Sequence, residues 1–114
     1  MKFKILENEF SVCKITDIKS VDFAQEFIFL SKTDEELSLV CESNHVPPNA
    51  THIEPNWRAF RIDQELDFSL IGIIAKITET LAEAKISVFV ISTYNTDYVL
   101  IKSPDFKKAL SLLD

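Results

Sequence analysis

The sequence predicts an α+β fold, because several short apolar stretches surround one long amphipathic segment. Two pairs of these stretches are joined by a few polar residues, FIFLSKTDEELSLV and VFVISTYNTDYVLI, and each pair is typical of a β-hairpin. Residues 70–85 carry apolar side chains at helical spacing, namely Leu70, Ile73, Ile74, Ile77, Leu81 and Ala84. Hairpins and a helix with one apolar face together indicate antiparallel sheets covered by helices.

The first half is expected to contain strands at Lys2–Leu6, Phe10–Ile15, Glu26–Ser31 and Glu36–Cys41. We interpret Glu7–Glu9 as a turn between the first two strands, and Lys32–Glu35 as the turn of the hairpin. Thr16–Gln25 has Ile18 and Val21 three residues apart, which favours one or two helical turns. Ser43–Asn56 contains three prolines and three asparagines without periodicity, so it is predicted to be a connecting loop.

The second half predicts a strand at Trp57–Ile62, a helix at Leu70–Lys85, strands at Ile86–Thr93 and Tyr98–Lys102, and a closing helix at Asp105–Leu113. Ser69 is a natural N-cap, and Pro104 is suited to the start of the closing helix. The stretch from Ile86 to Thr93 is apolar on both of its faces. A strand with two apolar faces needs cover on both, so we expect it to be central in its sheet.

The order strand, helix, strand, strand indicates the ferredoxin-like arrangement. The two hairpins can be aligned with Ser31 against Ser92, which favours a duplication. Two half-sized copies are expected to pack together, because neither alone buries enough area to be stable.

Composition and charge exclude several classes of function. The 114 residues have a formal net charge of −6, and the lysines are scattered among carboxylates, so we expect neither nucleic acid nor membrane as a partner. The N-terminus lacks a secretory signal and no apolar run spans a bilayer, which favours a cytoplasmic protein. Cys13 and Cys41 are expected to be reduced and buried in strands.

Catalytic and metal-binding motifs are not recognisable in the sequence. A chain with one glycine has no P-loop, no G-x-G-x-x-G and no G-x-S-x-G. Cys41, His45 and His52 do not match a zinc spacing, and they are better explained as strand and loop residues. We therefore expect a protein that is not an enzyme, with no cofactor and no metal.

Two features are candidates for a binding site. Gly72 is the only glycine and falls in the predicted first turn of the long helix, where it costs about 1 kcal/mol relative to Ala. It indicates either close approach of a ligand to the free amides of that turn or tight packing of helix on strand. Asp97, near the hairpin tip, can pair with an ammonium group or simply stabilise a turn. In one ferredoxin-like unit we expect these features to lie apart, so that a neighbouring module supplies one of them.

The stretch WRAFRI and the run LDFSLIGIIAKITETLAEAKISVFVISTYNTDYVLIK resemble small bacterial tandem ACT-domain proteins. These are related to the ACT repeats of eukaryotic cytosolic arginine sensors and to the regulatory part of aspartate kinases. The resemblance covers Trp57–Leu113 through FSL-x-G, A-x-ISVF and STYNTDY-x-L, and it is looser over Met1–Pro48. It implies two βαββαβ modules packed in tandem, a degenerate N-terminal one at residues 1–53 and a C-terminal one at residues 54–114. The C-terminal helix is a candidate for packing on the first module.

The resemblance also implies a function. ACT modules bind small effectors, typically amino acids, between modules, and they often dimerise, so a homodimer is expected. Carried over by position, the residues that would contact the carboxylate end are Ser69, Leu70, Ile71 and Gly72. Those flanking the amino group or side chain would be Thr93, Tyr94 and Asp97. This chain has Ile71 where many small bacterial relatives have Thr, which removes a hydroxyl. The alternative is a module for oligomerisation or partner binding that has lost its ligand.

Overall fold

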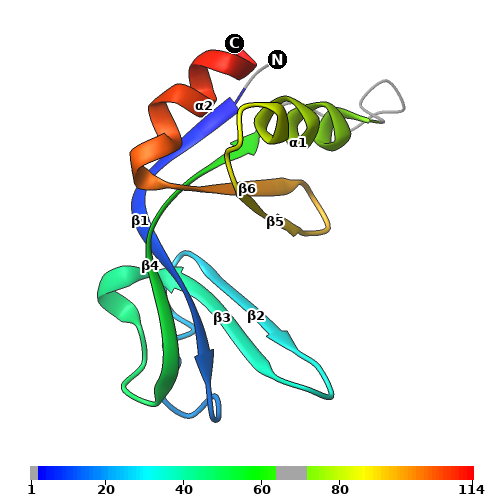
Figure 1. Ribbon diagram of the computed structural model, residues 1–114. Coiled ribbons are helices and arrows are strands. Elements are labelled where there is room, and N and C mark those ends of the chain that lie inside the picture. The colour runs from blue at the N-terminus through cyan, green and yellow to red at the C-terminus, as the bar shows by residue number, and fades with distance from the viewer. Residues whose placement is uncertain (1–2, 64–71) are drawn as a thin grey trace. The chain divides into compact units, whose positions relative to one another are not determined.

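The computed structural model describes residues 3–63 and 72–114 (Figure 1). The elements in chain order are β1 (Phe3–Ile15), β2 (Ile28–Lys32), β3 (Leu37–Glu42), the 3-10 helix η1 (Ser43–His45), β4 (Ala50–Ile62), α1 (Ile73–Glu83), β5 (Val88–Ser92), β6 (Asp97–Lys102), the 3-10 helix η3 (Ser103–Asp105) and α2 (Phe106–Leu113). The strands are hydrogen-bonded in the order β2-β3-β1-β4-β6-β5. The predicted α+β class with antiparallel hairpins is confirmed.

The chain divides into two compact units. Unit 1 comprises Met1–Glu7 and Arg58–Asp114, and unit 2 comprises Asn8–Trp57. Each of the 13-residue strands β1 and β4 therefore contributes to both units.

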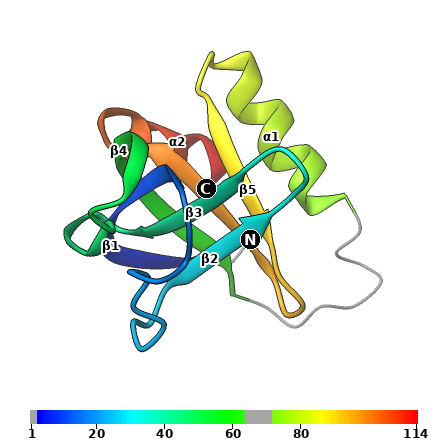
Figure 2. The same ribbon diagram turned by 90° about the horizontal axis from the view of Figure 1, so that it is seen from below.

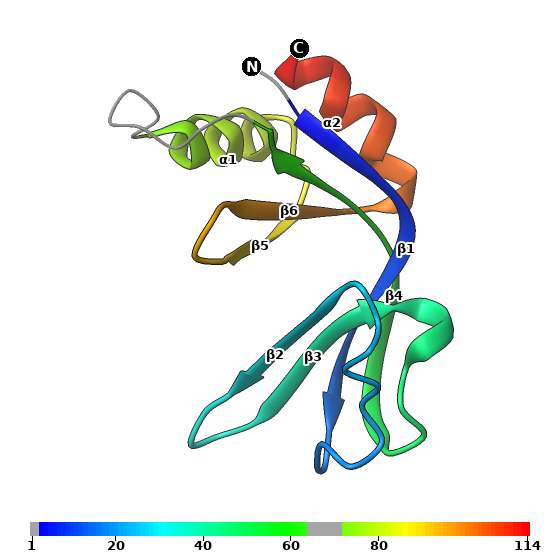
Figure 3. The same ribbon diagram turned by 180° about the vertical axis from the view of Figure 1, so that it is seen from behind.

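Unit 1 has two helices on one face of its strands (Figures 1 and 3). After β4 the chain runs through α1, β5, β6 and α2, and the beginning of β1 completes a β-α-β-β-α-β set. Its core comprises Phe60, Ile62, Ile77, Leu81, Ile86, Val99, Ile101, Phe106 and Ala109. The Phe60 ring lies 4.6 Å from the ring of Phe3 and 6.4 Å from that of Phe106, so aromatic packing joins β4 to β1 and α2.

Arg58 adds a polar link within unit 1. Its Nη2 donates a hydrogen bond to the carbonyl of Leu6 at 3.1 Å, and its guanidinium carbon lies 4.7 Å from the centre of the Phe106 ring. A guanidinium over an aromatic face is a cation–π contact, so Arg58 ties the start of β1 to α2.

Unit 2 covers its sheet with loops instead of long helices. Its core cluster comprises Cys13, Ile15, Val21, Leu39 and Cys41. Thr16–Gln25, where one or two helical turns were predicted, forms only bends and turns. The Asp17 and Asp22 carboxylates cause this, because they accept the amides of Lys19 at 2.9 Å and Ala24 at 3.1 Å. Such local acceptors compete with helix formation, and the helical prediction is wrong.

Two predicted breaks in the chain are strands in the structure. The turn predicted at Glu7–Glu9 is wrong, because β1 runs without interruption from Phe3 to Ile15. The loop predicted at Ser43–Asn56 ends early, because β4 begins at Ala50. Asn56 has a φ of 69°, a left-handed conformation that asparagine tolerates better than most residues. Polar residues at these positions reflect exposed strand segments and not turns.

The predicted position of β5 in the sheet is also wrong. It was expected to be central, but it lies at one edge of the strand order. Its side chains from Val88 to Ile91 are half-buried, whereas Val99, Leu100 and Ile101 of the neighbouring β6 are fully buried.

The two hairpins repeat with an interval of 60 residues. Lys32 pairs with Leu37 and Ser92 pairs with Asp97, so the two registers match when Lys32 is set against Ser92. The predicted alignment of Ser31 with Ser92 is therefore shifted by one residue, which would exchange the two faces of the strand.

The helices agree with the prediction in their apolar faces, but α1 ends at Glu83 and not at Lys85, and α2 begins at Phe106 and not at Asp105. Ile77 and Leu81 of α1 are fully buried, as the apolar spacing predicts. In α2, Phe106 and Ala109 are buried, after a 3-10 turn that contains Pro104. No helix within residues 3–63 and 72–114 is long and apolar enough to cross a membrane.

Candidate functional site

Gly72 precedes α1 as its N-cap and is not part of the first turn. Its φ is 89°, a left-handed conformation that side chains rarely adopt. A Cβ at Gly72 would meet no atom of the described residues within 4 Å, so tight helix-on-strand packing does not explain the glycine. The backbone conformation explains it. The predicted position inside the helix is wrong because α1 begins at Ile73.

The first backbone amides of α1 have no hydrogen-bond partner within the helix. The first intrahelical hydrogen bond runs from the Lys76 amide to the Gly72 carbonyl at 2.9 Å, so the amides before Lys76 lack helical partners. Gly72 supplies no side chain to cap them, and it is exposed. The predicted contacts Ser69, Leu70 and Ile71 lie outside the described residues. Amides at a helix start favour negatively charged groups.

The predicted contact Thr93 belongs to the turn that connects β5 to β6. Its amide and its hydroxyl both donate to the Thr96 carbonyl, at 2.8 and 2.9 Å. The Thr96 amide in turn donates to the Thr93 hydroxyl at 3.3 Å. Tyr94, at the next position, is fully exposed. The Thr93 hydroxyl is therefore engaged in shaping the turn, and the Tyr94 ring projects into solvent.

Asp97 was predicted to lie near the hairpin tip, but it is the first residue of β6. It pairs across the hairpin with Ser92, whose hydroxyl donates to its carboxylate. Because side chains alternate along a strand, Asp97 lies on the same face as Val99 and Ile101, which pack in the core under α1. Asp97 as a whole is thus partly buried on the helix-covered face of unit 1, while the hydrogen bond of its carboxylate to Ser92 is exposed.

The turn and the start of α1 lie at the same end of unit 1. Figures 1 and 2 show the β5–β6 turn and the first turn of α1 on one side of the unit. The Thr96 hydroxyl donates to the carbonyl of Ile62, the last residue of β4, at 3.1 Å. The expectation that one unit keeps these features apart is wrong, because α1 runs back from the end of β4 and β5 returns to that end.

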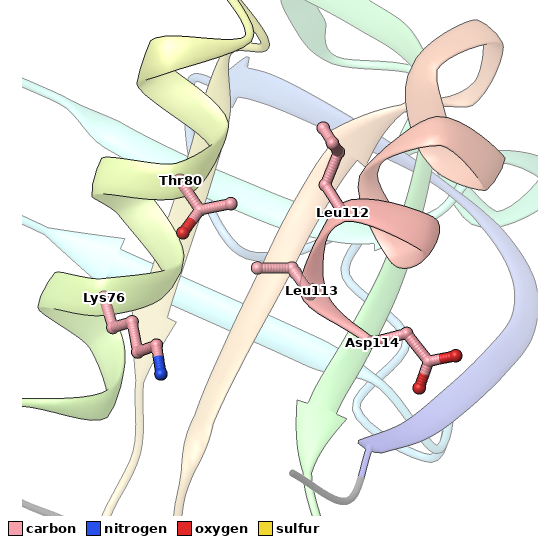
Figure 4. Close-up of a pocket in the computed structure, with 5 residues that line it drawn as sticks. All are labelled: Lys76, Thr80, Leu112, Leu113 and Asp114. Atoms are coloured by element: carbon pink, nitrogen blue, oxygen red, sulfur yellow. The ribbon is translucent and has the colours of Figure 1, made fainter.

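A separate groove lies between α1 and α2 and was not foreseen from the sequence. It has a volume of about 290 Å³ and is lined by Lys76, Thr80, Leu112, Leu113 and Asp114 (Figure 4). The described members of the predicted site, Gly72, Thr93, Tyr94 and Asp97, are not among its lining residues. The four-residue spacing of Lys76 and Thr80 signals a shared helix face, but their partner helix could not be known from spacing alone.

The two cysteines are free and buried, as predicted. The Cys13 thiol donates to the carbonyl of Leu39 at 3.4 Å. A hydrogen bond between the thiols lowers the pKa of Cys13, and the same contact together with burial raises the pKa of Cys41. Their strand positions make them part of the core of unit 2.

Comparisons with known proteins give a consistent result. The family model of the ACT domain matches residues 52–114. A solved structure of a protein from Agobacterium tumefaciens is similar over 97% of this chain and 84% of its own, with 28% identity and a TM-score of 0.86. A Vibrio cholerae protein of unknown function, described as a possible transport protein, has 21% identity and a TM-score of 0.74 over 97% of this chain and 85% of its own.

The ligand-free regulatory subunit of aspartate kinase from Thermus thermophilus has the same fold. It is 9% identical, with a TM-score of 0.70 over 98% of this chain and 95% of its own. No curated protein sequence matches this chain. The family model covers most of the residues that form unit 1, including the α1 start and the β5–β6 turn.

Proposed function

The chain belongs to the ACT domain family, and from this premise we propose that it is a non-catalytic regulatory protein that binds an amino acid. The candidate site is the end of unit 1 where Gly72, the turn at residues 93–96 and Asp97 lie. ACT domains are regulatory modules, and a regulatory subunit of aspartate kinase shares this fold. The identity of the effector as an amino acid rests on the chemistry of the site.

The observation that carries the proposal is the position of Asp97. The residue is partly buried on the helix-covered face, at the end where the first amides of α1 have no partner within the helix. An amino acid carries a carboxylate and an ammonium group a few ångströms apart. Helix amides suit the carboxylate of the amino acid, and the Asp97 carboxylate suits its ammonium group. The Ser92 hydroxyl orients the Asp97 carboxylate by donating to one of its oxygens, Oδ1.

The assembly that we propose is a tandem of two ACT-like modules, at residues 1–53 and 54–114, in a homodimer. The repeat of the hairpins at an interval of 60 residues supports the tandem. Both hairpins are followed by a 3-10 helix, at Ser43–His45 and Ser103–Asp105. A duplicated module that lost its long helices in one copy accounts for both features.

The test is a thermal-shift scan against the common amino acids, followed by calorimetry with any that stabilise the protein. Asp97→Asn keeps the shape of the side chain and removes its charge. We expect it to weaken binding about tenfold or more, since hydrogen bonds to charged groups contribute about 1.5–3 kcal/mol. Asp34→Asn, in the turn of the other hairpin, is the matched control and should leave affinity unchanged. No stabilisation by any amino acid at millimolar concentration would overturn the proposal.

A second candidate function is a protein-interaction module without a ligand. The engagement of the Thr93 hydroxyl within its own turn favours it, because that group is then unavailable to an effector. The same scan separates the two functions. A stable assembly with no response to amino acids supports the interaction module, whereas stabilisation that is lost in Asp97→Asn supports effector binding.

A further inference from the structure

The groove between α1 and α2 has one polar, cationic wall and one apolar wall, and both helices belong to unit 1. Lys76 and Thr80 line it from α1, while Leu112, Leu113 and Asp114 line it from the end of α2 (Figure 4). Its volume of about 290 Å³ lies at the lower limit of pockets for small molecules, which measure about 300–1,000 Å³. The groove is therefore suited to a ligand with a short carbon chain.

The polar groups on the α1 side are not engaged by the part of the chain that the structure describes. Thr78 of the same helix donates its hydroxyl to the carbonyls of Ile74 and Ala75, at 2.9 and 3.1 Å, as threonines within helices commonly do. Within residues 3–63 and 72–114 the Thr80 hydroxyl makes no such bond, and Lys76 forms no ion pair. A cation and a hydroxyl, one helical turn apart on the same face, are thus both available to a ligand.

The α2 side supplies an apolar surface that the core of unit 1 leaves partly uncovered. Leu113 packs against that core, whereas Leu112 is 42% exposed. In Figure 4 the Leu113 side chain points toward α1, and the Asp114 carboxylate points away from Lys76 and Thr80. The lining of the groove therefore contains no carboxylate that neutralises the Lys76 ammonium group.

We propose that this groove binds a small aliphatic carboxylate. Its carboxylate group accepts hydrogen bonds from the Lys76 ammonium group and the Thr80 hydroxyl, and its carbon chain covers Leu112 and Leu113. This orientation keeps the negative charge away from the end of α2, where the helix carbonyls carry partial negative charge. The lining side chains offer no carboxylate that points into the groove, so the ligand needs no ammonium group and differs in class from an amino acid.

The groove is separate from the proposed effector site but shares helix α1 with it. Gly72 and Asp97 are not among the lining residues of the groove, and the Lys76 amide bonds to the Gly72 carbonyl in the first turn of the helix. A ligand that contacts both helices stabilises the position of α1 relative to α2 within unit 1. The inference goes beyond amino-acid binding and does not rest on it.

The test is a titration of the full chain with isovalerate, followed through its amide resonances in nuclear magnetic resonance spectra. We expect isovalerate to shift the resonances of Thr80, Leu112 and Leu113, with a dissociation constant of about 1 mM, since a ligand of this size makes few contacts. Isovaleramide keeps the shape without the charge, and acetate keeps the charge without the chain. Each should bind about fivefold more weakly or worse.

Matched variants separate the charge of Lys76 from charge in general. Lys76→Gln keeps most of the stem and removes the ammonium group, so it should weaken isovalerate binding about fivefold, as expected for an exposed ion pair. Lys107→Gln makes the same change at an exposed position of α2 outside the groove, and it should leave binding unchanged. Thr80→Val keeps the shape and removes the hydroxyl, and it should weaken binding about threefold.

The two proposed sites can fail independently. Asp97→Asn should leave isovalerate binding unchanged, and Lys76→Gln should leave amino-acid binding unchanged. Shifts confined to Gly72 and residues 93–97 would show that the carboxylate binds at the effector site, which contradicts the inference. No shift well above the expected dissociation constant, equal binding of isovaleramide, or equal effects of Lys76→Gln and Lys107→Gln would each overturn it.

Discussion

The hairpins β2–β3 and β5–β6 have the same backbone and different chemistry. Both turns begin with a threonine whose amide bonds to the carbonyl three residues later, Thr33 to Glu36 at 2.9 Å and Thr93 to Thr96 at 2.8 Å. The first cross-strand pair after the turn is Lys32 with Leu37 in one hairpin and Ser92 with Asp97 in the other. The two hairpins therefore share their register and the hydrogen bonds of the turn threonine. They differ in the residues of the first pair beyond the turn.

The units around these hairpins differ in cover and in charge. Unit 1 contains both long helices, whereas unit 2 covers its core with the loop at residues 16–27 and a 3-10 helix. Nine of the 18 acidic residues and nine of the 12 basic residues belong to unit 1, so the net charge of −6 lies entirely in unit 2. The effector site that we propose therefore lies in the helix-covered, neutral unit, while unit 2 carries the charge.

The largest expected effect is on the free energy of unfolding when a leucine is removed from either core. Leu39 of unit 2 and Leu81 of α1 are both fully buried. If the loop is as good a cover as the helix, Leu39→Ala and Leu81→Ala should each lower the free energy of unfolding by about 2–5 kcal/mol, measured by urea denaturation. Leu112→Ala, at an exposed position, is the control. A cost well below that range for Leu39→Ala alone would show that the loop collapses into the space and that its packing is looser.

A smaller effect is expected for the two turns. Thr33→Ala and Thr93→Ala remove equivalent hydroxyls that bond within the turn. Each should cost about 1 kcal/mol, the usual net contribution of one hydrogen bond. Replacement by Ser keeps the hydroxyl and should restore most of the stability in both turns. Unequal losses in urea denaturation would contradict the equivalence of the two scaffolds.

The smallest effect concerns acid stability of the loop in unit 2. The Gln25 amide and the Ala24 backbone amide lower the pKa of Asp22 below its ordinary value of 3.8. Its carboxylate is more acidic in the folded state, so it stabilises the fold above its unfolded pKa, and this contribution is lost as the pH falls through the folded pKa. Asp22→Asn should therefore reduce the loss of thermal stability between neutral and acidic pH. Asp34→Asn, in the exposed turn, is the matched control, and an equal effect of both would contradict the assignment.

Sequence patterns correctly predicted the helices and strands that bury one face. They failed at residues 7–9, where the chain passes from one unit to the other. Helix α1 and both hairpins follow from apolar spacing, because packing against a core demands that spacing. The continuity of β1 through Glu7–Glu9 did not follow. Polar residues there resemble a turn, although they occupy an exposed stretch of strand at the boundary of the two units.

The sequence suggested pairing a helix start with Asp97 but expected the two features to come from different modules. In the structure the start of α1 and the β5–β6 turn lie at one end of unit 1. The true reason for the glycine, a φ of 89°, could not be deduced, because apolar spacing carries no information on the conformation of a single residue. The engagement of the Thr93 hydroxyl depends on turn geometry that only coordinates reveal.

The division of β1 between the units has a consequence for how the protein folds during synthesis. Asn8–Trp57 emerges from the ribosome as one uninterrupted segment and can fold early, since compact parts of a chain generally fold as they appear. Phe3–Glu7 must wait, because its partners in unit 1 start at Arg58 and end with the last helix. Closing that long loop costs entropy before any contact is gained, so the beginning of β1 is expected to dock late although it is synthesised before its partners in unit 1.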